Sequence, residues 1–232
     1  MAEPEASTGG KAVPERAEWL VTELLERAIA GVGPFAGAEQ IAEELVGDAE
    51  DVEQAIERLI RTHVRLAAGS GFVTSLGGFL TLPVSVPAGV GGLYLIATRM
   101  CAAIAHLRGY DVHSEEVRSA IMLCLLGSAG TEVLKNAGVQ IGTKSTMAAL
   151  RRLPGRVLVE INKKVGFRLV TKFGQRGVIN LAKLVPAVGG VIGATVDGVG
   201  CRSIAVYAKS TFPAVDRGRP APIVVESRRV ER

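Results

Sequence analysis

The sequence has few aromatic side chains, no close pair of cysteines and, over one long segment, no charge. Aromatic residues are 4% of the chain, whereas all hydrophobic residues are 48%, so the core must be built mainly from Ala, Val, Leu and Ile. Cys101, Cys124 and Cys201 lie far apart, which argues against a disulfide framework and favours a reducing compartment. The N-terminal residues lack the basic and apolar stretches of a secretory signal. We therefore expect a cytoplasmic location.

Charged residues are missing altogether between Leu66 and Thr98. An uncharged run of this length is typical of a membrane span, for which about 20 apolar residues suffice. Glycines interrupt the run throughout, and Pro83 and Pro87 are expected to break a continuing helix. The segment therefore favours a kinked, closely packed helical region. Two interpretations stay open: helices that pack through small residues, or a region that enters a bilayer shallowly or holds an acyl chain.

Apolar residues recur at helical spacing through most of the chain, and no sustained alternation typical of strands occurs before a short run at Ile223–Val225. The predicted fold class is therefore all-α, a single domain of packed helices over residues 15–212 with glycine-rich central and C-terminal helical hairpins. Residues 1–14 are expected to be a disordered tail, and residues 213–232 a second tail. The expected helices cover residues 15–30, 39–46, 49–64 after a cap at Asp48, 88–108, 115–126 after a cap at Ser114, and 186–208.

Charge is distributed unevenly along the chain, although the net charge is only +4. Residues 1–60 carry 14 acidic and four basic side chains, whereas residues 140–185 carry ten basic side chains and Glu160 as the single acid. Such asymmetry indicates an interaction surface, whose partner is lipid, nucleic acid or the acidic part of the chain itself. Nucleic acid is disfavoured because the basic stretch has few aromatic side chains for base stacking.

The basic stretch has the pattern of an interfacial amphipathic helix. On a helix, Lys164, Arg168 and Lys172 stack on one side, with apolar residues toward the other. We expect it to bind anionic membrane lipids, with each cation near the surface contributing about 1 kcal/mol. A solvated face, or a partner for the acidic helices, is the alternative. The candidate lipid-binding residues are Arg151, Arg152, Arg156, Lys163, Lys164, Arg168, Lys172 and Arg176.

Three charged residues lie within otherwise apolar helices. Arg99, Asp197 and Arg202 are candidates for buried ion pairs, because an unpaired buried charge costs several kcal/mol. We expect an Arg99–Asp197 pair that joins the central helix to the last one. Gly189, Gly193 and Asp197 share one face of that last helix, at a spacing that permits close helix packing.

Catalytic machinery is not evident in the sequence. Gly138–Ser145 is similar to a phosphate-binding loop, but Thr143 stands where that motif needs glycine. The histidines and cysteines lack the spacing of a zinc site, and His63 and His106 are expected at helix surfaces. We therefore expect no enzymatic activity, no cofactor and no metal. An enzyme acting on lipid would require a buried polar cluster around Arg99, His106 and Asp197 beside a cavity of ligand size.

Two blocks of sequence resemble the EcsC family. Residues 60–127 carry a Gly-Phe-x-Thr segment (GFVT), a Leu-Pro…Pro step (LPVSVP), an Arg-Met pair and an Ile-Ala…Gly-Tyr turn (IAHLRGY) before an acid-rich helix start. Residues 184–212 (LVPAVGGVIGATVDGVGCRSIAVYAKSTF) resemble the family's terminal Pro-x-x-Gly-Gly-x-x-Gly helical hairpin, and INKKVGFRLVTKFGQRG between the blocks also fits. The resemblance implies a helical, bacterial, membrane-associated protein of poorly defined function, and it supplies no catalytic residues.

Together these observations predict a non-enzymatic, membrane-associated, lipid-binding helical protein on the inner face of a membrane. Its expected partners are anionic membrane lipids and a membrane protein complex, and nucleic acid is not expected. The alternative is a protein-interaction module that regulates a membrane transporter or protease complex.

Overall fold

The computed structural model describes residues 9–33, 35–76, 78–139, 146–179 and 188–214. Two short strands form a small antiparallel hairpin, so the described residues give the predicted all-α fold with one minor addition. In chain order the elements are α1 (Gly9–Ala30), β1 (Gly31–Val32), β2 (Phe35–Ala36), α2 (Ala38–Gly47), α3 (Val52–Leu76), α4 (Gly78–Leu107), α5 (Glu115–Leu126), α6 (Ser128–Asn136), α7 (Thr146–Leu150), α8 (Gly155–Ile179) and α9 (Val188–Thr211).

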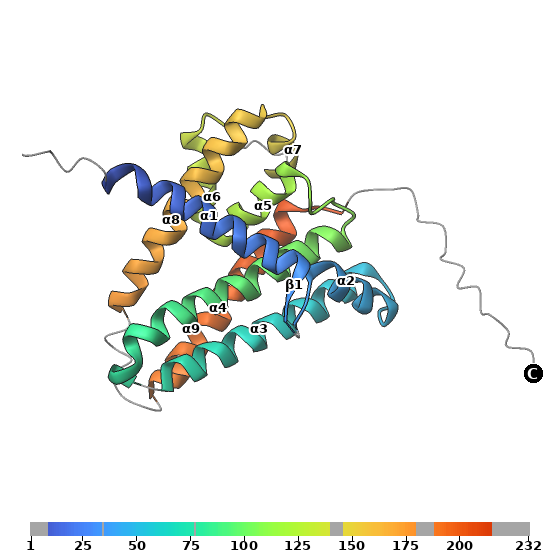
Figure 1. Ribbon diagram of the computed structural model, residues 1–232. Coiled ribbons are helices and arrows are strands. Elements are labelled where there is room, and N and C mark those ends of the chain that lie inside the picture. Colours follow the sequence, from blue (N-terminus) through green and yellow to red (C-terminus); the bar gives the residue numbers. More distant parts are fainter. Residues whose placement is uncertain (1–8, 34, 77, 140–145, 180–187, 215–232) are drawn as a thin grey trace, which may run out of the picture.

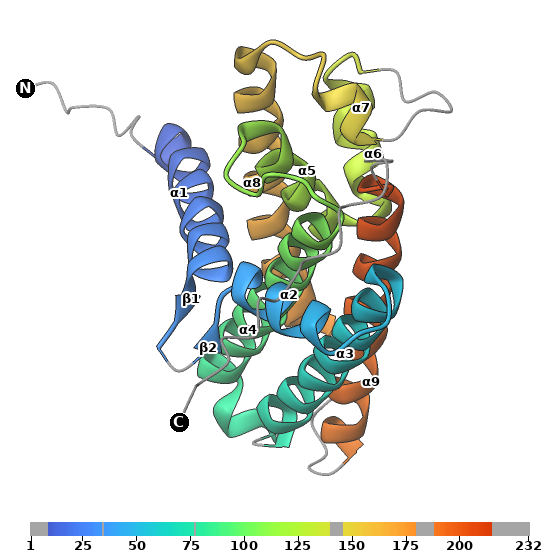
Figure 2. The same ribbon diagram turned by 90° about the vertical axis from the view of Figure 1, so that its right-hand side faces the viewer.

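The helices form a bundle with α4 and α5 in its middle (Figures 1 and 2). Figure 2 shows α1 and α8 on one flank and α3 and α9 on the other. The most extensive contact between two helices is that of α3 with α9. In Figure 1, α9 begins at the end of the bundle where α3 ends and α4 begins, and α8 runs toward the same end. We call this the glycine-rich end of the molecule.

The core is built on the second half of α4 and on α5. All residues from Met100 to Ala105 and from Ser119 to Leu126 are buried. A helix that is apolar on every side is buried on every side, so the hydrophobicity of this part of α4 follows from its central position and needs no lipid. Small side chains at Ala102, Ala103 and Ala105 let neighbouring helices approach closely.

Several expected helix boundaries differ from the structure. The helix α4 is continuous from Gly78 to Leu107, so the prediction that Pro83 and Pro87 break it was wrong. Each proline removes one backbone donor, but the hydrogen bonds on either side still close, and a helix can continue through such a site. The helix α1 begins at Gly9, inside the expected tail over residues 1–14. Residues 1–8 lie outside the described part of the chain.

The two expected capping residues act differently from the prediction. Asp51, not Asp48, begins α3, because its Oδ1 accepts a hydrogen bond from the backbone N–H of Gln54 at 2.7 Å. Asp48 lies at the C-terminal end of α2. Ser114 precedes α5 as expected, but its hydroxyl donates to the carbonyl of Asp111 at 2.8 Å and does not cap the helix.

The contact between α3 and α9 depends on two glycines. A Cβ atom at Gly193 would lie less than 3.0 Å from the carbonyl oxygen of Gly71 and from the side chain of Ser75. A Cβ atom at Gly71 would meet the carbonyl of Gly193 and the carboxylate of Asp197 in the same way. Gly193 and Asp197 therefore face α3 together, as their spacing predicted. The C-terminal element is a single helix over the described residues, and not the expected hairpin.

Substitution of Gly193 by alanine should push α3 and α9 apart. We expect Gly193→Ala to lower the free energy of unfolding by about 2 kcal/mol, the cost of forcing one methyl group into a filled contact. Gly200→Ala is the matched control on α9, because nothing lies within 4 Å of its Cβ position. This control should raise stability by about 0.5–1 kcal/mol through helix propensity. Urea denaturation of both variants measures the difference, and equal effects would contradict the close contact.

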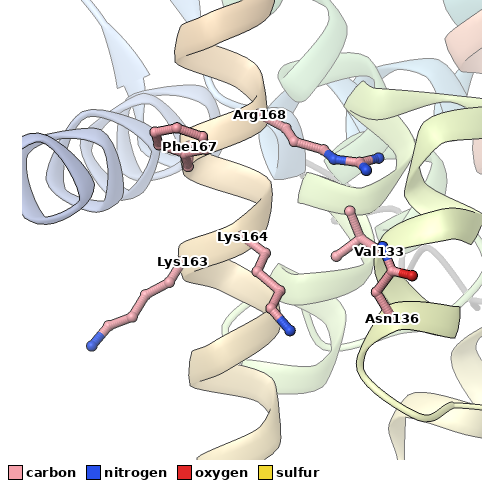
Figure 3. A pocket seen from close by; sticks show the side chains of 6 residues that line it. All are labelled: Val133, Asn136, Lys163, Lys164, Phe167 and Arg168. Atoms are coloured by element: carbon pink, nitrogen blue, oxygen red, sulfur yellow. The ribbon is translucent and has the colours of Figure 1, made fainter.

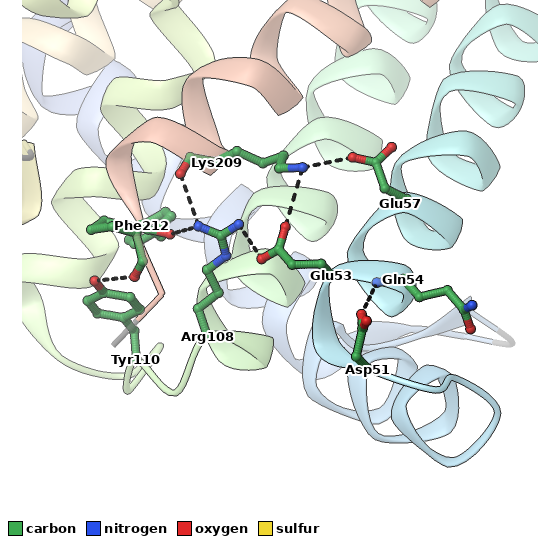
Figure 4. A network of polar contacts seen from close by, with 9 residues as sticks. Asp51, Glu53, Gln54, Glu57, Arg108, Tyr110, Lys209 and Phe212 are labelled. Atoms are coloured by element: carbon green, nitrogen blue, oxygen red, sulfur yellow. Dashed lines mark hydrogen bonds and ion pairs between the residues drawn. The ribbon is translucent and has the colours of Figure 1, made fainter. Parts of the chain in front are cut away.

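Arg108 joins the C-terminal end of α9 to α3 and α4 (Figure 4). Its Nη1 donates to the carbonyls of Lys209 (3.3 Å) and Phe212 (2.7 Å), and its Nη2 donates to Glu53 on α3 at 2.5 Å. The last carbonyls of a helix lack partners within the helix, so a cation placed there completes them and favours the helix dipole. The Tyr110 ring packs on Phe212 at 5.3 Å, and its hydroxyl donates to the carbonyl of Pro213.

Loss of the Arg108 guanidinium should cost far more stability than loss of the neighbouring ammonium of Lys209. The Arg108 side chain is 8% exposed, whereas that of Lys209 is 32% exposed. We expect Arg108→Met to destabilise the fold by about 3 kcal/mol, because it leaves buried carbonyls without donors. Lys209→Met should cost at most about 1 kcal/mol, as is usual for a solvated ion pair. Thermal and urea unfolding compare the two variants, and similar losses of stability would refute the proposed role of Arg108 at the end of α9.

Candidate functional site

The eight candidate basic residues are spread along a long helix and the turn before it. Arg151 and Arg152 precede α8, while Arg156, Lys163, Lys164 and Arg168 lie on it. Arg152, Arg156 and Lys163 are exposed and have no acidic partner among the described residues. Arg151 lies over the Tyr110 ring, with 5.3 Å between the guanidinium carbon and the ring centroid. The side chains of Lys172 and Arg176 lie outside the described part of the chain.

Lys164 and Arg168 border a groove between α6 and α8 of about 360 Å³ (Figure 3). Their side chains extend toward α6, whereas Lys163 points away from it. Lys164 forms an ion pair with Glu160 at 2.8 Å, and Arg168 pairs with Glu132 at 3.1 Å and donates to the carbonyl of Ala129. An anion can therefore bind in this groove only in competition with two carboxylates.

The acidic N-terminal helices find their partners elsewhere in the bundle, on α4, α5, α9 and the segment before α5. Among the described residues, the acidic segment contacts the cations Arg108, Arg118 and Lys209 and the imidazoles of His106 and His113, not the basic stretch. The pairs are Glu26 with Arg118, Glu39 with His106 and His113, Glu53 with Arg108 and Lys209, and Glu57 with Lys209. Arg156 and Lys163, which are exposed on α8, are therefore available to another partner.

The three charges predicted in apolar helices have separate environments. Arg99 is half-buried, and its Nε donates to His63 Nε2 at 3.3 Å while its Nη1 donates to the carbonyl of Ala36 at 3.4 Å. The expected partner of Arg99 was Asp197, but the carboxylate of Asp197 lies against Gly71 in the contact between α3 and α9. Arg202 is exposed, so its predicted burial was wrong.

His63 is 2% exposed and holds Arg99 in place. Its Nδ1–H donates to the carbonyl of Leu59 at 2.9 Å, which leaves Nε2 as the acceptor for Arg99. Burial lowers the pKa of His63 to about 4, with a further lowering by the Arg99 charge, so the imidazole is neutral at pH 7. Burial also lowers the pKa of Arg99.

Arg99 lies in an apolar pocket of about 310 Å³ between the hairpin, α3 and α4. The hairpin contributes Val32 and Phe35, α3 contributes Leu66, and α4 contributes Leu95 and Ile96. The hairpin was missed from the sequence, because two strands of two residues carry no measurable alternation. The only signal available was the pair of glycines at Gly31 and Gly33, which both have positive φ.

The three cysteines are buried and free. A hydrogen bond with Cys124, together with burial, raises the pKa of Cys101. Burial raises the pKa of Cys201 to about 12, with a smaller contribution from the charge of Asp197. Neutral buried thiols are poor nucleophiles and poor metal ligands. No cluster of three or more His, Cys, Asp or Glu side chains suited to a metal occurs among the described residues.

The fold and its contacts define a class of protein: a helical bundle with a tightly packed glycine contact, a basic helix on one flank and an apolar pocket that contains Arg99 and is bordered by Arg27. The EcsC protein family model matches residues 6–213, nearly the whole chain. The protein therefore belongs to the EcsC protein family, as the motifs in residues 60–127 and 184–212 suggested. Neither a search of curated proteins nor a search of solved structures found a match.

The lowered pKa of His63 makes the stability of the fold depend on pH in a defined direction. Above about pH 6.5 both folded and unfolded chains keep this imidazole neutral, so its contribution is constant. As the pH falls toward 4, the unfolded chain binds a proton that the folded chain does not, and about 3 kcal/mol of stability is lost.

His63→Gln should remove this part of the pH dependence. Urea denaturation of the wild type and the variant from about pH 7.5 to about pH 4.5 gives the difference directly, since the carboxylates contribute equally to both. Parallel pH dependences of the two proteins would contradict a buried neutral histidine.

Proposed function

We propose that this protein is a non-enzymatic, membrane-associated, lipid-binding protein that attaches peripherally to the cytoplasmic face of a membrane. The observation that supports the proposal is the outward face of α9. Val191 is 62% exposed and Val199 65%, so apolar side chains in the first half of α9 contact water, and Val206 near the other end of the helix is 62% exposed. Apolar surface gathered in this way is typical of an interaction site.

Length and composition of α9 agree with lipid contact. Gly190–Thr211 is long and apolar enough to cross a membrane, with a mean hydropathy of 1.2 and 33% of its most apolar 18-residue stretch buried. Its polar anchors favour contact at the surface over spanning, because Lys209 pairs with Glu57 at 2.7 Å and Asp197 faces Gly71. Leaving these partners would place charges in hydrocarbon at a cost of several kcal/mol.

The surface proposed for lipid contact is the glycine-rich end of the molecule. Phe72 is 40% exposed and Val73 is 67% exposed near the end of α3, and the neighbouring Gly71 lies against Gly193, two residues after Val191 on α9. The helix α8 runs toward this end as well, so Lys172 and Arg176 lie on its nearer part. Arg151, Arg152 and Arg156 lie at the opposite end of α8, which removes them from the surface that we propose to meet lipid.

Attachment should therefore depend on the exposed valines of α9 more than on the arginines before and at the start of α8. We expect Val191→Gln/Val199→Gln to weaken binding to anionic vesicles by about tenfold, because two partly exposed apolar side chains lose their transfer energy. Arg152→Gln/Arg156→Gln should change binding by less than about threefold. Both pairs are exposed, so folding is preserved in each variant.

Flotation with purified vesicles measures these affinities, with neutral vesicles and added salt as the electrostatic controls. Absence of binding to any vesicle, or unchanged binding of the valine variant, would overturn the proposal. Attachment to native membranes but not to lipid vesicles would instead indicate a protein partner.

A further inference from the structure

The pocket that contains Arg99 has the size and shape of a ligand site. Its volume of about 310 Å³ falls at the lower end of the range for small-molecule pockets. The walls are apolar, with Val32 and Phe35 from the hairpin, Leu66 from α3, and Leu95 and Ile96 from α4. Phe35 is 64% exposed and Leu66 is 45% exposed, so solvent reaches the pocket between them.

Arg99 is a cation without a carboxylate partner among the described residues. Its two hydrogen bonds go to neutral acceptors, His63 Nε2 and the carbonyl of Ala36, at the long distances of 3.3 and 3.4 Å. A guanidinium has five N–H donors, so others stay available for a ligand. A half-buried positive charge that no anion balances is complemented best by an anion that enters the same pocket.

His63 and the hairpin fix the direction in which Arg99 can bind. The imidazole accepts a hydrogen bond from Nε of Arg99, and the Ala36 carbonyl accepts one from Nη1. Both hold the planar guanidinium against the pocket. Carboxylates match this planar group with two parallel hydrogen bonds. The second arginine of the pocket, Arg27, is paired with Glu23 at 2.7 Å, so the site offers a single free positive charge and suits a monoanion.

We propose that this pocket binds one fatty carboxylate, with the head group on Arg99 and the alkyl chain against Val32, Phe35 and Leu66. This site deepens the proposed lipid-binding function by naming the class of lipid, but it requires no bilayer. A single chain in the pocket is chemically distinct from a membrane surface that contacts α9.

Calorimetric titration of the full chain with decanoate, below the critical micelle concentration, tests the proposal in solution. Decanoate should bind with a 1:1 stoichiometry, whereas decanol tests the chain without the charge and acetate tests the charge without the chain. We expect decanoate to bind at least about tenfold more tightly than either. Equal binding of decanoate and decanol, or no binding of decanoate, would overturn the proposal.

Three variants locate the ligand. Arg99→Met should weaken decanoate binding at least about tenfold and abolish its advantage over decanol. Arg27→Met is the matched control at the same pocket and should alter the affinity by less than about twofold, because that cation is already paired. If Arg99→Met does not fold, Leu66→Gln on the exposed rim still decides the matter, with an expected loss of about threefold. Decanoate affinity unchanged by Arg99→Met, or by Leu66→Gln in its place, would refute the site.

The vesicle and decanoate experiments fail independently. If the protein floats with vesicles but does not bind decanoate, only the fatty-carboxylate site is refuted. If the protein binds decanoate but does not float, the ligand site is supported and membrane attachment is refuted.

Discussion

The direct contact of the α3 and α9 backbones at Gly71 and Gly193 is the constraint on which the rest of the structure depends. Because these residues have no side chains, the two helices approach closely enough for Asp197 to lie against Gly71. This approach brings the C-terminal end of α9 to Arg108 and Glu53. It also decides which residues of α9 face outward, and these include the exposed valines.

Charge pairing sorts the molecule into two parts. Glu26 of α1 and Glu53 and Glu57 of α3 are paired with Arg108, Arg118 and Lys209, so these acids add to the cohesion of the bundle. Arg152, Arg156 and Lys163 carry charge that this network does not use. The contrast between the N-terminal segment and residues 140–185 therefore does not describe two halves that neutralise each other.

Local signals predicted most of the helices, and non-local contacts account for the differences. The bounds of α5 were predicted at Glu115 and Leu126 because a polar residue precedes the helix and acidic residues occupy its first turn. The shared face of Gly193 and Asp197 also followed from spacing alone. The continuity of α4 through two prolines did not follow from the sequence, because the tendency of proline to interrupt a helix does not say whether the helix resumes after it.

The candidate sites were harder to predict because their contacts also join residues that are far apart in the sequence. Arg99 was recognised as an unusual charge, but its partner His63 is 36 residues away and was expected at a helix surface. A neutral histidine that holds an arginine requires a buried tautomer, which no sequence pattern encodes. Arg108 was missed altogether, since an arginine at the end of a helix is common on solvated surfaces, and only the fold reveals that it completes another helix.

The length of α8 separates the electrostatic environments of its two ends. A helix of 25 residues extends about 37 Å, several times the Debye length of about 8 Å at physiological ionic strength. A bilayer at the glycine-rich end would therefore not sense Arg151, Arg152 and Arg156 at the far end. Arg152 and Arg156 would remain accessible to an acidic protein while the opposite end is occupied by lipid, because both are exposed.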